Sequence, residues 1–170
     1  MPRRALVAVI DRAFWLAIAA LVALGATSLA LSLVRRDSQR WVRHGHEVGR
    51  LARDAALLAV DRETGVRGYL LTHDERSLAP ERAARTPLHA KLDSLARITS
   101  DNPAQRRRAL AIAGALGAWE RDVAAPIVAG AVRAGGPLAG KPEFDVVRAR
   151  FADFMGEEDR LFREREARDR

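Results

Sequence analysis

The chain has 170 residues, enough for one domain with an additional segment, and its formal net charge is +7. It contains no cysteine, which excludes disulfides, CxxC redox pairs and thiolate metal sites. The charge does not indicate a nucleic-acid-binding domain, because more than half of the excess comes from arginines that flank one apolar segment within residues 1–36.

The first predicted element is a transmembrane helix over residues 13–34. This stretch, AFWLAIAALVALGATSLALSLV, contains no charged residue. As a helix it would reach about 33 Å, enough for a hydrocarbon core of about 30 Å. Arginine and aspartate bound it on both sides, and these side chains insert unfavourably into lipid. The alternative is a cleaved signal peptide, but the apolar core of such a peptide usually has only about 7 to 15 residues. We therefore expect an uncleaved membrane anchor.

Residues 37–170 predict four amphipathic helices, because apolar residues recur there every three or four positions. The first helix continues from the membrane segment. Its stripe consists of Trp41, His44, Val48, Leu51, Ala55, Leu58, Arg62, Gly65 and Tyr69.

The second helix is predicted to open at Thr72, which has the capping-box spacing with Glu75. Pro80 falls early in this helix, where proline is tolerated. Pro87 suggests a bend or a later start. The apolar stripe consists of Leu88, Leu92, Leu95 and Ile98.

The third helix has the clearest start, with Asn102 as N-cap, Pro103 as first helical residue and Gln105 as capping-box partner. Pro126 suggests a kink near its end, and residues 134–142 predict a loop before the fourth helix. The stripes of these two helices are Ile112, Leu116, Trp119, Val123 and Ile127, then Phe144, Val147, Phe151, Phe154, Glu158 and Leu161. The sequence therefore predicts an all-α protein in which an N-terminal transmembrane helix precedes an antiparallel four-helix bundle.

No pattern in the sequence predicts catalysis. Residues 135–141, GGPLAGK, match part of a phosphate-binding loop, but Pro142 replaces the Ser or Thr that would hold magnesium, so we interpret them as a loop. The four histidines lack metal-ligand spacing, and no Ser, His and acid constellation is evident. We therefore expect no catalytic residues, no metal, no cofactor and no nucleic-acid partner, and we interpret the arginines at 106–108 as a solvated helix face.

Residues 61–75, DRETGVRGYLLTHDE, resemble the signature of the third CHASE family, extracellular sensory domains associated with cyclases and histidine kinases. The similarity continues through Leu78 and Pro80. It then includes Thr99, Asp101, Asn102, Pro103, Gln105 and Leu110. His73 departs from the family, which usually has glycine there, and Glu81 stands where an aromatic residue is common. Members usually continue into a second membrane helix and an output module, neither of which is recognised in this sequence.

The resemblance implies a bacterial sensory input domain at the cytoplasmic membrane. Residues 1–12 would then form a cytoplasmic tail and residues 37–170 an extracytoplasmic bundle, an orientation that the arginines on both sides of the span do not settle. The expected partners are the lipid bilayer, a second copy in a homodimer, a signalling protein and an unidentified small molecule. The alternative is a non-sensing adaptor that binds another membrane protein.

The signature residues have two interpretations, a ligand site or a helix corner. The candidates are Glu63, Thr64, Gly65, Arg67, Gly68, Tyr69 and Asp74. Gly65 lies on the stripe, where it would let another helix approach closely, and Gly68 would help the chain to turn. Glu63 and Arg67 are four apart, so they support the helix if exposed. If buried, they form a polar spot that is a better ligand or switch candidate.

Overall fold

The structure, a computed structural model, describes residues 2–131 and 140–168. This part of the chain is helical and contains no strand, which confirms the predicted all-α class. Its elements are α1 (Pro2–Thr72), the 3₁₀-helix η1 (Glu75–Leu78), α2 (Ala79–Ile98), α3 (Pro103–Trp119), the π-helix η2 (Glu120–Ala124), α4 (Ala125–Val128) and α5 (Lys141–Arg168).

The chain divides into two compact units, Met1–Arg43 and His44–Arg170, and α1 contributes to both. In the first unit, most of the large apolar side chains from Phe14 to Leu29 are 58% to 70% exposed, and Ile18 is half-buried. In the described part of the chain, no helix is both long and apolar enough to be assigned as a membrane span. The predicted transmembrane helix over residues 13–34 is therefore not supported by the structure.

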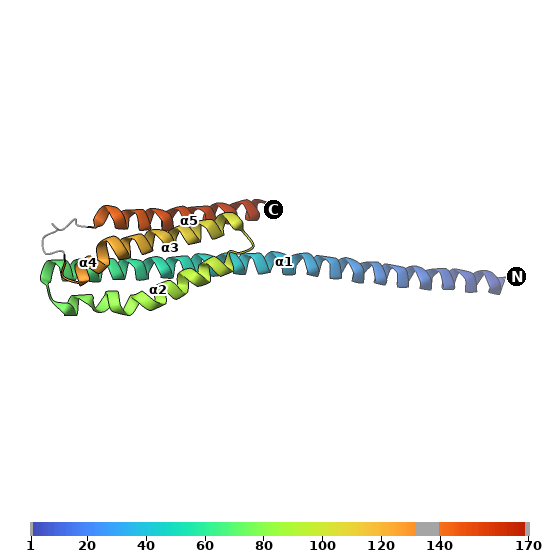
Figure 1. Cartoon of the computed structure of the whole chain (residues 1–170). Helices are drawn as coiled ribbons and strands as arrows, with labels where there is room; N and C mark the ends of the chain where they lie inside the picture. Colours follow the sequence, from blue (N-terminus) through green and yellow to red (C-terminus); the bar gives the residue numbers. More distant parts are fainter. Residues whose placement is uncertain (1, 132–139, 169–170) are drawn as a thin grey trace. The chain divides into compact units, whose positions relative to one another are not determined.

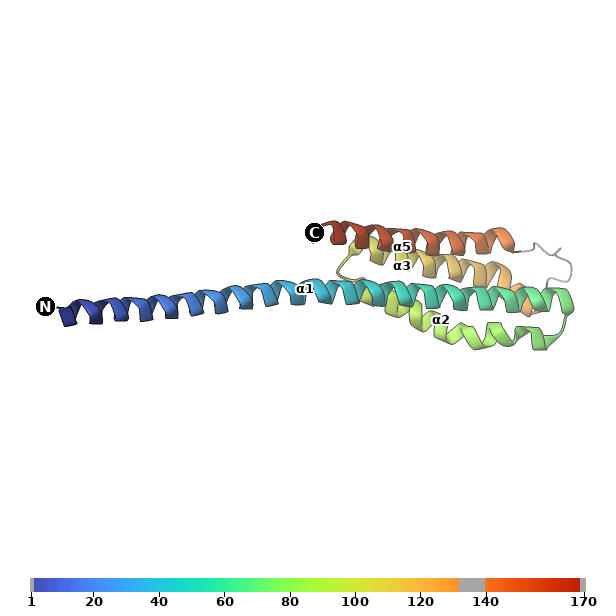
Figure 2. The ribbon, with the colours of Figure 1, turned by 180° about the vertical axis from the view of Figure 1, so that it is seen from behind.

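In the second unit, four helical segments lie side by side and alternate in direction (Figures 1 and 2). They are the part of α1 from His44, then α2, then α3 with η2 and α4, and finally α5. Each segment contributes apolar side chains to one core, such as Val66, Leu88, Leu116 and Phe154. This arrangement fits the predicted antiparallel bundle, and the buried residues of α2, α3, α4 and α5 follow the predicted stripes. In α1 the stripe is only partly right, because Trp41 is exposed and residues outside the stripe, such as Ala52 and Val66, are buried.

The start of α3 is largely as predicted. Asn102 caps it, because its side-chain oxygen accepts hydrogen bonds from the backbone nitrogens of Ala104 (3.1 Å) and Gln105 (3.2 Å). The capping-box role of Gln105 is wrong. Its side chain is buried and donates to a carboxylate oxygen of Glu158 in α5, so it links two helices instead of closing back on its own.

A π-helical turn, η2, lies just before Pro126, where a kink was predicted. The N–H of Ala125 donates to the carbonyl of Glu120, five residues earlier. Pro126 has no N–H, so at an interior α-helical position it would leave one backbone hydrogen bond of the helix unmade. The wider π-helical turn just before Pro126 disturbs the pattern of hydrogen bonds less. Of the loop predicted at 134–142, residues 134–139 lie outside the described residues. Its last two residues, Lys141 and Pro142, belong to α5.

Candidate functional site

The corner after α1 consists of residues 73–78, and Asp74 organises it. The Asp74 side chain accepts a hydrogen bond from the backbone nitrogen of Arg76 at 2.9 Å and caps η1. The Arg76 side chain also donates to this carboxylate and, together with that backbone bond, holds the pKa of Asp74 below its usual value. The predicted capping box is wrong, because Thr72 is the last residue of α1 and its hydroxyl donates back to the carbonyl of Gly68.

His73 lies in the left-handed region, with φ of 54°. Its backbone N–H donates to the carbonyl of Tyr69, four residues back, as in an αL helix end. This is the conformation that glycine adopts most easily, which explains why glycine would suit the position. Gly68 does not have the predicted turning role, because it lies within α1 and is not among the residues with positive φ.

Gly65 brings the start of α2 close to α1. A Cβ atom on Gly65 would lie 2.8 Å from the backbone nitrogen of Glu81 and 2.9 Å from its Cβ. The close approach predicted for Gly65 is thus confirmed. It seats Glu81, only 1% exposed, beside the same helix turn.

Glu63 and Arg67 form an ion pair that reaches α5. Arg67 Nη1 lies 3.2 Å from Glu63 Oε1, and Arg148 in α5 donates to the other carboxylate oxygen. Of the two alternatives neither applies fully, because the Glu63 side chain is 4% exposed whereas that of Arg67 is 33% exposed. Only the carboxylate is buried. Thr64, by contrast, is exposed, and Tyr69 is half-buried with its ring edge-on to His73.

A second set of polar and charged side chains, which we call the Arg62 network, consists of Arg62, Glu81, Arg85, His89 and Glu120. The Arg62 side chain is 3% exposed, and its Nη2 lies 3.0 Å from Glu81 Oε1. Arg85 donates to the same oxygen at 2.7 Å. On the other side, Arg62 Nη1 and His89 Nε2 both contact Glu120 Oε1. The network thus joins α1, α2 and η2.

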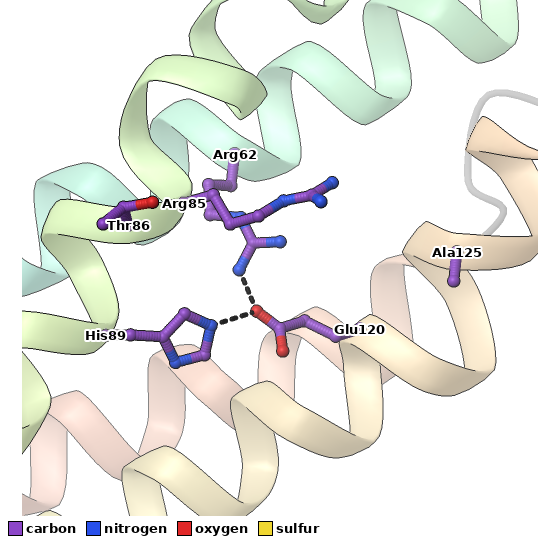
Figure 3. A pocket seen from close by; sticks show the side chains of 6 residues that line it. All are labelled: Arg62, Arg85, Thr86, His89, Glu120 and Ala125. Carbon is purple, nitrogen blue, oxygen red and sulfur yellow. Dashed lines mark hydrogen bonds and ion pairs between the residues drawn. The ribbon is translucent and has the colours of Figure 1, made fainter.

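The Arg62 network opens to a pocket of about 400 Å³ between α2 and the η2–α4 segment (Figure 3). Its lining residues are Arg62, Arg85, Thr86, His89, Glu120 and Ala125. Figure 3 shows the Glu120 side chain extending between Arg62 and His89. Small-molecule sites are usually concave spaces of about this size or larger, with a few placed polar groups. The pocket is therefore the candidate functional site.

No pattern in the sequence predicts this pocket. Arg62 lies on the predicted apolar stripe of the first helix, and His89 has no partner at metal-ligand spacing. One signal was available: Arg62 is a charged residue at a core position, and a buried arginine needs carboxylate partners. The sequence could not identify those partners, because Glu81 and Glu120 come from other helices, 19 and 58 positions away.

Neither the phosphate-loop-like segment nor a metal site adds to the pocket in the described part of the chain. Of the phosphate-loop-like segment, only Gly140 and Lys141 are described, and Lys141 Nζ is paired with Asp145 Oδ2 at 2.7 Å. Within the residues that the structure covers, no group of three or more metal-ligating side chains was found.

The chain was compared with known proteins in three ways. Residues 38–168 match the model of the CHASE3 domain. Comparison with the curated proteins and with the solved structures gave no match. The family match spans the corner, the Glu63 ion pair and the Arg62 network, and confirms the resemblance drawn from residues 61–75. CHASE3 domains are sensory input domains of signal transduction and not catalytic modules, and this chain belongs to the CHASE3 domain family.

Proposed function

We propose that the chain is a membrane-anchored sensory input domain whose bundle lies on the extracytoplasmic side of the cytoplasmic membrane. The observation that carries the proposal is that the CHASE3 match at 38–168 directly follows the uncharged apolar stretch at 13–34. The apolar side chains exposed between Phe14 and Leu29 are of the kind that a bilayer would cover. Residues 1–12 would remain in the cytoplasm, and a signalling protein would receive the output.

The orientation can be tested by cysteine labelling, because the natural chain has no cysteine. Ser100→Cys lies in an exposed turn of the bundle, and Arg4→Cys lies before the apolar stretch. A membrane-impermeant maleimide applied to intact spheroplasts should label the Ser100→Cys chain, and should label the Arg4→Cys chain only after detergent is added. The cysteine-free chain is the background control.

The opposite labelling pattern would place the bundle in the cytoplasm and overturn the orientation. Labelling of both positions in intact spheroplasts, together with release of the chain by alkaline carbonate, would overturn the anchor itself.

A further inference from the structure

The polar groups of the pocket offer more hydrogen-bond donors than acceptors. Of its charged lining residues, Arg62 and Arg85 are cationic and Glu120 is anionic. An arginine has five N–H donors. The contacts of Arg62 with glutamates use its two terminal nitrogens, and its Nε is buried without a hydrogen-bond partner among the described residues. Thr86 adds a hydroxyl to the wall. Such a lining favours an anion over a cation or a neutral molecule.

Glu120 already shows how a carboxylate fits these donors. One of its oxygens lies 2.9 Å from His89 Nε2 and also accepts from Arg62 Nη1. The Glu120 side chain is 24% exposed, whereas Glu81, the other glutamate of the network, is 1% exposed. Glu120 is therefore the carboxylate that an incoming anion can replace, and Glu81 remains as the fixed counter-charge behind the two arginines.

We propose that this pocket binds a small carboxylate anion, which takes the place of the Glu120 carboxylate between Arg62 and His89. This inference rests on the proposed sensory function and names the chemical class of its ligand. The exchange keeps the charge balance of the pocket, because one carboxylate replaces another beside the two arginines. The volume of about 400 Å³ lies within the range of small-molecule sites.

The position of Glu120 links this exchange to the shape of the bundle. Glu120 is the first residue of η2, the π-helical turn that interrupts the helix between α3 and α4. Single π-helical turns occur often at functional sites. Release of Glu120 removes a contact that ties this turn to α1 and α2, so ligand binding alters how the turn is held.

The test is a titration of the full chain in detergent with sodium acetate. The NMR signals of the histidine rings are recorded at each acetate concentration. The chain has four histidines, and only His89 lines the pocket, so the other three are internal controls. Acetate should cause a saturable shift of the His89 signals alone. Methylammonium chloride at the same ionic strength should cause none. The proposal is overturned if no signal shifts or if all four shift together without saturation. Tighter binding of inorganic phosphate than of acetate would overturn the carboxylate class.

Matched variants locate the site. Arg85→Gln should weaken acetate binding roughly tenfold, because it removes a charged donor from the pocket. Arg82→Gln is the control: both arginines lie on α2, both pair with a glutamate, and both are more than half exposed, but Arg82 does not line the pocket. Glu120→Gln should tighten binding roughly tenfold, because it removes the competing charge. Equal effects of the two arginine variants, or weaker binding to Glu120→Gln, would contradict the proposal.

The two proposals fail separately. A chain that binds acetate but is labelled in the wrong orientation loses only the proposed topology. A correctly anchored chain whose His89 signals ignore acetate loses only the proposed ligand.

Discussion

At the scale of single residues, Gly65 sets the distance between α1 and α2. A methyl group there would meet backbone atoms of Glu81, which cannot rotate away as a flexible side chain does. We predict that Gly65→Ala lowers the free energy of unfolding by about 2 kcal/mol, within the usual range for overpacking. Gly114→Ala is the matched control, because Gly114 is also helical and has no atom within 4 Å of its added Cβ.

Gly114→Ala should instead raise stability by about 1 kcal/mol through helix propensity. Urea unfolding followed by circular dichroism measures both variants. A stable Gly65→Ala chain would mean that the helices can separate without cost, and would remove the argument that this contact fixes Glu81 beside Arg62.

The sequence predicted the approach at Gly65 because a small residue on an apolar stripe is a local signal. The buried polar residues were harder to predict. The sequence left open whether Glu63 is exposed or buried, and the structure shows that it is buried and paired with Arg148 from α5. Pairings of this kind depend on how helices distant in sequence meet, which a periodic pattern does not contain.

At the scale of elements, the corner between α1 and α2 depends on a charged cap. The pKa of Asp74 is lowered, first by the hydrogen bond from the Arg76 side chain and then by the Arg76 backbone N–H. A carboxylate whose pKa is lowered in the folded chain stabilises the fold at pH values above its ordinary pKa, here 3.8. This contribution is lost as the pH falls through the pKa of the folded state.

We predict that Asp74→Asn, which keeps a capping oxygen but cannot be charged, is less stable than the natural chain at pH 7. This difference should shrink as the pH falls below 3.8. Urea unfolding at a series of pH values measures it. A difference that stays constant down to the lowest pH would show that the carboxylate charge is not what holds the corner.

The element boundaries show where sequence patterns fail. The N-cap at Asn102 was predictable because the cap, the proline and the helix are adjacent in the chain. At the earlier corner, Thr72 and Asp74 both offer a side-chain oxygen, and the helix end that decides between them is set by the left-handed turn at His73. Near the end of the third helix, Pro126 predicted a kink, but nothing in the sequence indicated that the kink would take the form of a π-helical turn.

At the scale of the whole molecule, α1 presents an exposed apolar stripe away from the core of the bundle. Leu57, Val60 and Leu71 are 65%, 39% and 61% exposed, and with the exposed Thr64 they recur at spacings of three, four and seven, which places them on one helix face. This stripe suits the predicted homodimer, because a two-fold axis beside α1 would let each copy cover the same residues of the other.

We predict that Thr64→Cys chains form a disulfide-linked dimer when membranes are treated with a mild oxidant, because Thr64 lies within the stripe and no other cysteine competes. Asp93→Cys, at an exposed position of α2, is the control and should remain monomeric. The measurement is non-reducing gel electrophoresis over a range of expression levels. Crosslinking that rises equally at both positions with expression would indicate random collision. Absence of a Thr64→Cys dimer would show that α1 does not pair through this face, and the exposed stripe would then no longer support the predicted homodimer.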